Sequence, residues 1–228
     1  MRAIFVKSNL ITNSVVELSE ESAHHLNVVR AKLNDDILVL NGLGEKAIGS
    51  LIAITKKSGS IKISEVQREL PKNQFRLAVA CPKKDAFEDI LKMAIELGIT
   101  EIQPLTSEFS QFEYTSSERI DRLIESALIQ SNNLIRPTIH NQITLENFLL
   151  DLDSQLFYFS SKPVDSQNKI VPSENAFILI GPEAGFSEAE TLKTAEFSKS
   201  ISIHLNTAIM RAPTAVAASV GYLLSSQK

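Results

Sequence analysis

The segment 181–187, Gly-Pro-Glu-Ala-Gly-Phe-Ser, has the composition of a ligand-binding loop. It follows an apolar run and precedes a helical pattern, and Ser187 with Glu190 forms the S-x-x-E capping box that starts a helix. Gly181 and Gly185 carry no side chains and let a ligand lie against the backbone. In a parallel sheet such a loop lies at the carboxyl edge, where ligands bind. We therefore predict a ligand site here. The alternative is a strand-to-helix turn that needs glycine.

A second segment with the same context lies at residues 205–214, Leu-Asn-Thr-Ala-Ile-Met-Arg-Ala-Pro-Thr. It also follows an apolar run and precedes a helical pattern, and Pro213 suits the first turn of that helix. Asn206 tolerates the unusual backbone angles of a tight loop. Arg211 is the only Lys or Arg in residues 200–227. Its place at a second strand edge predicts a functional role, with an ordinary surface arginine as the alternative.

Several common catalytic motifs are excluded. Residues 42–47 match G-x-G-x-x-A, but a strand-like pattern follows them, so they have no helix N-terminus to serve a dinucleotide. A P-loop, G-x-S-x-G and H-E-x-x-H are absent, and the four histidines lack metal-ligand spacing. The single cysteine, Cys81, ends an apolar run beside Lys83 and Lys84. We expect a buried structural thiol, with a lysine-activated thiol as the alternative.

Two regions with different hydrophobic periods position these loops. Residues 1–72 show five short strand patterns and one helix that begins after Ser19, which predicts a small barrel. A polar linker with a proline spans 69–74. From residue 73 to 228, apolar strand patterns alternate with amphipathic helices, which is typical of a mostly parallel α/β sheet.

The overall composition is that of a folded protein: 228 residues, 43% hydrophobic, 22% charged, with a net charge of -4. Residues 1–72 carry 10 Lys or Arg against 8 Asp or Glu, a slight basic excess that includes Arg30 and Lys32. These two side chains are candidate phosphate contacts. The sequence has no apolar run long enough to span a bilayer, and it has no signal peptide. We therefore expect a cytoplasmic protein without a membrane partner.

The order of motifs resembles the RsmE family, the ribosomal RNA small subunit methyltransferases E of the SPOUT superfamily. The match runs along essentially the whole chain. Its most specific part is Gly181-Pro182-Glu183-x-Gly185-Phe186-Ser187; the weaker parts are His24-His25-Leu26 with Val29 to Lys32, Asn41-Gly42-x-Gly44, Lys83 to Ile99, Ile102-x-Pro104-Leu105, Glu118-Arg119, Gln130-Ser131 and Leu205 to Arg211.

The resemblance implies a fold and an activity. It implies a PUA-like, RNA-binding β-barrel at 1–72 and a SPOUT α/β-knot at 73–228, whose C-terminal segment forms a trefoil knot. It also implies a homodimer that uses S-adenosylmethionine and no metal. The reaction would be methylation of N3 of a uridine in 16S ribosomal RNA, in free RNA or in the assembled 30S subunit.

It further implies roles for particular residues. Arg211 would be catalytic, by stabilising negative charge on the uracil, and Glu183 would be a candidate base by its position. RNA-binding residues would be Arg30, Lys32 and Lys83. The cofactor would lie against two of the loops, a third strand end and their apolar neighbours: Phe159, Ser160, Leu179, Ile180, Gly181, Pro182, Glu183, Gly185, Leu205, Asn206, Ile209 and Met210.

The chain departs from the family pattern at positions that bear on RNA docking. The family usually has Arg where Phe109 stands and Gly-Arg where Asn132 and Asn133 stand. It also has a second glycine in place of Ala184. It has Gly-Pro-Arg in place of residues 206–208, which end at Ala208, and Thr-Glu in place of residues 212–213, which end at Pro213. Two alternatives therefore stay open. One is a SPOUT methyltransferase for another RNA position, such as a ribose 2'-hydroxyl or a tRNA base. The other is a non-catalytic RNA-binding protein.

Overall fold

The structure is a computed structural model that describes residues 2–71, 75–160, 171–173 and 175–226. Its contacts divide the chain into a first unit, residues 1–71 with 125–136, and a second unit, residues 72–124 with 137–228. The predicted division at residue 72 did not include the return of 125–136 to the first unit. The end of the predicted linker, residues 72–74, lies outside the described residues.

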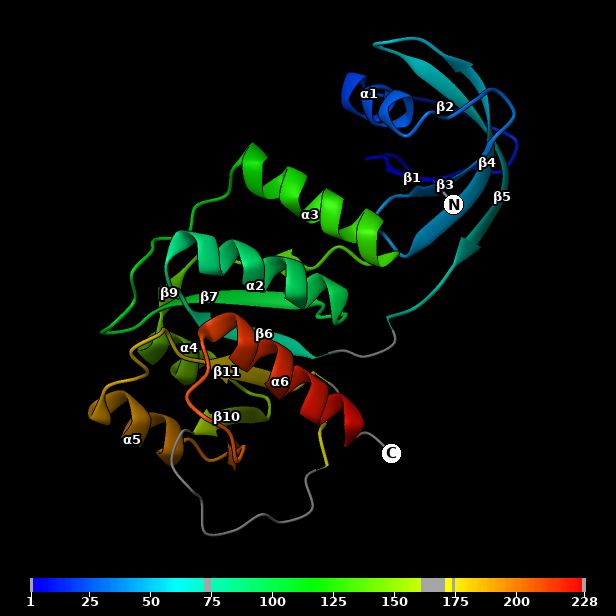
Figure 1. Ribbon diagram of the computed structural model, residues 1–228. Helices are drawn as coiled ribbons and strands as arrows, with labels where there is room; N and C mark the ends of the chain where they lie inside the picture. Colours follow the sequence, from blue (N-terminus) through cyan, green and yellow to red (C-terminus); the bar gives the residue numbers. More distant parts are fainter. Residues whose placement is uncertain (1, 72–74, 161–170, 174, 227–228) are drawn as a thin grey trace. The chain divides into compact units, whose positions relative to one another are not determined.

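The first unit contains a mixed five-stranded sheet in the order β1-β3-β4-β5-β2 (Figure 1). β1 is parallel to β3, and the other neighbours are antiparallel. Among the described residues β1 and β2 form the two edges and are not paired with each other, so the predicted closed barrel is an open ladder. The strands are β1 (Arg2–Phe5), β2 (Val15–Glu17), β3 (Asp36–Leu40), β4 (Glu45–Ile54) and β5 (Gly59–Arg68).

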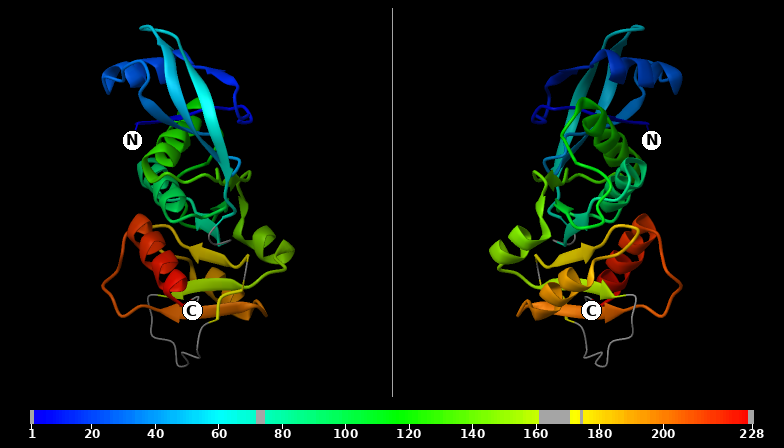
Figure 2. Two further views of the ribbon diagram at one scale, coloured as in Figure 1. Left: turned by 90° about the vertical axis from the view of Figure 1, so that its right-hand side faces the viewer. Right: turned by 90° about the vertical axis from the view of Figure 1, so that its left-hand side faces the viewer.

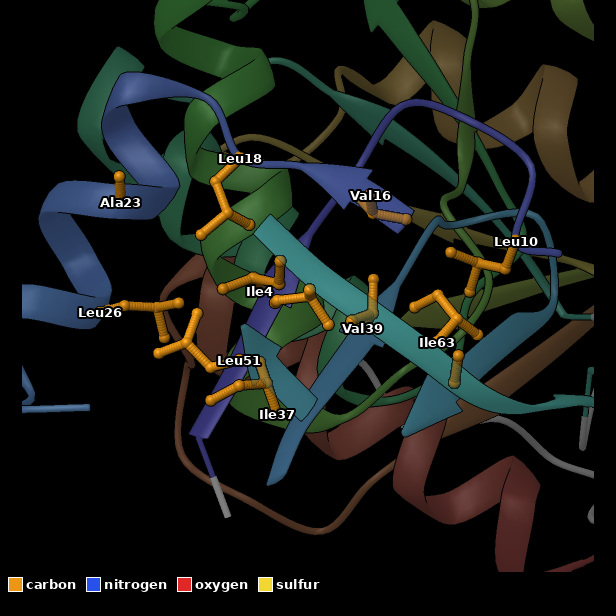
Figure 3. Packing of buried hydrophobic residues seen from close by; sticks show 12 residues of the cluster. Ile4, Leu10, Val16, Leu18, Ala23, Leu26, Ile37, Val39, Leu51 and Ile63 are labelled. Atoms are coloured by element: carbon orange, nitrogen blue, oxygen red, sulfur yellow. The ribbon is translucent and has the colours of Figure 1, made fainter. Parts of the chain in front are cut away.

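Helix α1 (Glu20–Val28) packs on the concave side of this sheet. Its N-cap is Ser19, whose hydroxyl accepts the Ser22 N–H, as the sequence predicts. Ala23 and Leu26 are fully buried and reach the sheet residues Ile4, Ile37 and Leu51 in one core (Figure 3). The helix thus contributes its apolar face to the core of the first unit. Val28, the last residue of the helix, is 65% exposed.

The turn between β3 and β4 anchors the returning segment 125–136. The Gly44 N–H donates to Leu134 O at 2.8 Å, and the Arg136 N–H donates to Gly42 O at 2.8 Å. A β-carbon on Gly42 would lie 3.0 Å from Arg136 Cβ, so only glycine allows this approach. The G-x-G-x-x-A pattern therefore serves packing within the first unit and not a nucleotide.

The second unit contains a parallel sheet in the order β12-β10-β11-β6-β7-β8, with β9 also paired to β7. Its strands were expected from their apolar runs, except for the two-residue β8 and β9, which are too short to show a pattern. The strands are β6 (Arg76–Ala80), β7 (Glu101–Thr106), β8 (Thr138–Ile139), β9 (Ile143–Thr144), β10 (Leu156–Ser160), β11 (Phe177–Ile180) and β12 (Ser200–His204).

Helices cover both faces of this sheet. α2 (Lys84–Glu96) packs against α6 (Ala212–Ser225), and α4 (Leu145–Asp151) packs against α5 (Glu188–Glu196). Figure 2 shows α6 and α4 on opposite sides of the sheet. Because strand side chains alternate between faces, both faces must be apolar, which explains the continuous apolar strands. The remaining helix, α3 (Glu118–Ser131), spans the boundary between the units at residue 125.

Within the described residues, no helix has the length and apolar character needed to cross a bilayer. The order of the strands and the packing of α6 on β11 are compatible with the predicted knot. The threading of the C-terminal segment itself stays a prediction.

We predict that Glu45 makes the first unit sensitive to acid. Its buried carboxylate accepts the Leu10 N–H at 3.2 Å and bonds to Arg68 and Asn41, and these contacts hold the pKa of Glu45 below its usual 4.5. A lowered folded pKa stabilises the native state at neutral pH, and this stabilisation is lost as pH falls below 4.5. Glu45→Ala leaves buried donors unpaired, so the free energy of unfolding at pH 7 should fall by about 1–3 kcal/mol.

Denaturant unfolding followed by circular dichroism at pH 7 and pH 4 measures the effect. The exposed Glu21→Ala is the matched control, with little expected change. An equal loss of unfolding free energy for both variants at pH 7 would show that the buried contacts of Glu45 do not stabilise the first unit.

Candidate functional site

The carboxyl ends of β10, β11 and β12 meet at one edge of the sheet in the second unit. Ser160 at the end of β10 is in register with His204 at the end of β12, and His204 Nδ1 lies 3.1 Å from Ser160 O. On the other side, Tyr158 of β10 is in register with Leu179 of β11. The loops that begin at residues 181 and 205 therefore leave from the same edge, as predicted.

The loop 181–187 uses its two glycines differently. A β-carbon on Gly181 would lie 3.2 Å from the Phe186 ring, so this glycine allows close packing inside the loop. Gly185 has a φ of +78°, and its N–H donates to Pro182 O at 2.9 Å in a tight turn. A β-carbon on Gly185 would meet no atom within 4 Å. Gly185 thus allows the positive φ of this turn. The space beside it is also open, as the binding of a ligand requires.

The capping box at the end of this loop is present as predicted. The Ser187 hydroxyl accepts the Glu190 N–H at 3.4 Å, and the Glu190 carboxylate accepts the Ser187 N–H at 3.0 Å. The loop therefore enters α5 at a defined angle.

The loop 205–211 exposes an apolar side chain at the same edge. The Thr207 N–H donates to Leu205 O at 2.7 Å and tightens the start of the loop. Ile209 is 91% exposed, although an isoleucine normally avoids water. Met210 is half-buried, and Asn206 is exposed. A residue that lines a ligand pocket or a subunit interface would be exposed in a single chain, as Ile209 is.

Arg211 is the N-cap residue of α6. Its backbone carbonyl accepts the Ala215 N–H, while its side chain is exposed. This hydrogen bond fixes the backbone of Arg211 at the start of α6. The exposed guanidinium can still reach a ligand. Glu183, the second catalytic candidate, is also exposed.

The remaining predicted cofactor residues have mixed surroundings. Phe159 packs edge-on against Tyr222 of α6 at 6.4 Å between ring centroids. Pro182 is buried, and Ile180 is 4% exposed. Leu179 is fully buried in the core on the α4 side of the sheet, so its side chain is packed there and does not line an open wall. The loop that follows Ser160 lies outside the described residues.

An additional loop, residues 107–111 after β7, lies against the segment 183–190. The Glu108 N–H donates to Glu190 Oε1 at 2.9 Å, and Gln111 Nε2 donates to Glu183 Oε2 at 3.4 Å. The sequence analysis missed this contact. Its one available signal was the position of the loop after a strand of the same parallel sheet, because carboxyl ends share an edge.

Arg30 and Lys32, the predicted RNA contacts of the first unit, lie together in the turn after α1. Arg2 holds this turn, because its guanidinium donates to Val29 O, to Arg30 O and to Asp35 Oδ2 at 2.8–3.1 Å. Arg30 has a φ of +54°, which is strained for a residue other than glycine. Both predicted side chains are exposed.

Lys83, the third predicted RNA contact, is exposed at the N-cap of α2 in the second unit. Nearby, Arg119 donates to both carboxylate oxygens of Glu88 at 3.0 and 2.8 Å. This pairing holds the pKa of Glu88 below its usual value. Glu88 of α2 is therefore paired with Arg119 of α3.

A comparison with known families supports this two-part organisation. A profile described as RNA methyltransferase PUA domain matches residues 18–64, and one described as RNA methyltransferase domain matches residues 68–224. The predicted PUA-like first region and the mostly parallel α/β second region are thereby confirmed.

Individual relatives agree with these profiles. "Ribosomal RNA small subunit methyltransferase E" of Rickettsia conorii is 30% identical over 93% of this chain and 90% of its own length. The protein of the same name from Synechocystis sp. is 28% identical over 98% of this chain and 78% of its length. A crystal structure of the Neisseria gonorrhoeae protein of that name, bound to S-adenosyl methionine, has a TM-score of 0.87 at 23% identity and covers 99% of this chain and 97% of its own.

We predict that Cys81 is unreactive in the folded protein. Burial raises the pKa of its thiol from 9.0 to about 12, so the neighbouring Lys83 and Lys84 do not activate it. Ellman's reagent at pH 8 should label no thiol in the native chain and one after unfolding in guanidinium chloride. Rapid labelling of the native chain would show that this thiol is accessible.

Proposed function

Since this chain belongs to the ribosomal RNA small subunit methyltransferase E family, we propose that it transfers a methyl group from S-adenosylmethionine to N3 of a uridine in 16S ribosomal RNA. The observation that supports this most is the shared edge of β10, β11 and β12, where the loop 181–187 leaves open space beside Gly185 and the loop 205–211 carries Arg211. Membership of this family makes the chain an RNA methyltransferase. We propose its methyl donor, its target nucleotide and the residues that act in the reaction.

The residues at this edge fit the donor. The open space beside Gly185 accepts an adenosyl group against the backbone of 180–185, and the exposed Ile209 offers apolar contact. The bound donor supplies a methyl group on a sulfonium, which needs no protein nucleophile. Among the described residues, His, Cys, Asp and Glu do not gather in groups of three that could hold a metal. Methyl transfer without a metal stays a prediction.

In our proposal, Arg211 and Glu183 act on the uridine. N3 of uridine becomes nucleophilic when it loses its proton, and the resulting negative charge spreads to the flanking carbonyl oxygens. In our proposal the exposed Arg211 guanidinium stabilises that charge and orients the ring. Glu183 accepts the N3 proton, with Gln111 holding its Oε2 so that the carboxylate keeps one orientation.

We also propose a cytoplasmic homodimer that binds the small subunit RNA through Arg30, Lys32 and Lys83. The exposed Ile209 is compatible with an apolar contact between copies. Light scattering tests the dimer.

Nucleoside mass spectrometry of small-subunit RNA, from a strain without the gene and from the same strain complemented, tests the reaction. Loss and return of 3-methyluridine is the expected result, with free 16S RNA and 30S subunits compared as substrates in vitro. A ribose-methylated nucleoside or a modified tRNA base would instead identify another RNA position. No change, together with calorimetry that detects no S-adenosylmethionine binding, would indicate a non-catalytic RNA-binding protein.

We predict that Gly185→Val weakens S-adenosylmethionine binding by about 100-fold or more. The valine side chain would occupy the open space next to the loop and would strain a backbone with a φ of +78°. Isothermal titration calorimetry measures the affinity, and circular dichroism checks the fold. Ala195→Val, on the exposed side of α5, is the matched control and should bind normally. Normal binding by Gly185→Val would place the pocket elsewhere.

We predict that Arg211→Ala lowers kcat by about 100-fold and leaves S-adenosylmethionine affinity within about twofold. The reason is that the guanidinium interacts with the negative charge that develops on the uracil. It does not interact with S-adenosylmethionine. Arg211→Lys should recover part of kcat, because an ammonium keeps the charge but not the planar fork. Arg122→Ala, an exposed arginine of α3, is the control. An equal loss of donor affinity would make Arg211 a pocket residue.

A further inference from the structure

We propose that Phe109 stacks on an RNA base beside the catalytic edge and so positions the substrate. This inference rests on the proposed function and adds a substrate contact to it. Phe109 lies between Glu108, whose N–H donates to Glu190 Oε1, and Gln111, whose Nε2 donates to Glu183 Oε2. Both contacts reach the segment 183–190. Phe109 therefore lies next to the loop that we assign to the cofactor and the reacting base.

The backbone around Phe109 is held in place. The Ser107 N–H donates to Ser110 Oγ at 2.9 Å, and the Ser110 N–H returns to Ser107 O at 3.1 Å. The Gln111 N–H donates to Cys81 O at 3.0 Å, which ties the loop to the end of β6. A loop held at several points presents a side chain in a defined position, so little ordering entropy is lost when a partner binds.

The two aromatic side chains that follow this loop have a different role. Phe112 and Tyr114 pack against Phe87 of α2, with ring centroids 5.7 and 5.4 Å apart. Phe109 is 39% exposed, so its ring is not fully used by the core. An exposed ring on a fixed loop beside a nucleic-acid site is the arrangement that stacking on an unpaired base requires.

The charges around Phe109 favour a base over a phosphate as its partner. Glu108 and Glu183 are exposed neighbours, and Glu190 contacts the same backbone. Carboxylates repel a phosphate, whereas a base face is uncharged and stacks on any aromatic ring.

The first test separates substrate binding from the chemical step. Phe109→Ala should raise KM for the RNA roughly 10-fold, with kcat and S-adenosylmethionine affinity within about twofold of wild type. Phe109→Leu keeps apolar bulk without a ring and should lose as much, while Phe109→Trp should keep wild-type KM. Leu150→Ala removes a side chain that is 77% exposed on α4 and should change nothing.

The second test reports stacking directly. The chain has three tyrosines but no tryptophan, so Phe109→Trp introduces its only indole, whose emission can be excited selectively. Titration with a 16S RNA transcript should quench its emission, because a stacked base quenches indole, while Leu150→Trp should respond little.

Three results would overturn the proposal: an unchanged KM for Phe109→Ala, equal quenching of both tryptophan variants, or loss of the dimer in Phe109→Ala by light scattering. The last result would show that the ring contacts a second copy. Failure of the proposed function is distinguishable, because the wild-type protein would then form no 3-methyluridine. If wild type forms this product and Phe109→Ala matches it in KM, only the stacking role fails.

Discussion

The parallel register of β10 with both β11 and β12 is the constraint on which the candidate site depends. It places β10 in the middle of three strands, so that the ends at Ser160, Ile180 and His204 come to one edge although up to 44 residues separate them in sequence. Backbone ladders fix this alignment to within one residue, because a slip would turn every side chain to the other face. The loops can then vary in sequence without losing their common location.

Local patterns were sufficient to predict much of this arrangement. The capping box at Ser187, the N-cap at Ser19 and the apolar strands all arise from interactions within a few residues, and the structure confirms them. The glycines of the 181–187 loop were also recognisable, because a positive φ and close packing both demand the absence of a β-carbon.

Contacts between distant residues were not predictable in the same way. The clamp of Arg2 on the turn of Arg30 joins residues 28 positions apart, and the hydrogen bond from Glu108 to Glu190 spans 82 positions. Neither has a periodic signal, because single charged or polar groups meet only after the fold is formed. Leu179 shows a related limit: its position at a strand end does not reveal which face its side chain takes, and the side chain lies in the core, so a cofactor contact through its backbone stays a prediction.

The anchoring of residues 134–136 by Gly42 and Gly44 has a consequence for synthesis on the ribosome. The first unit is made of two separate stretches of chain, so its sheet residues emerge well before the segment that covers Leu38 and Leu40 through Leu134. Until residue 136 has left the exit tunnel, Leu134 and Ile129 cannot pack on that apolar surface. Folding of the first unit is therefore completed only after residues 72–124 of the second unit have emerged.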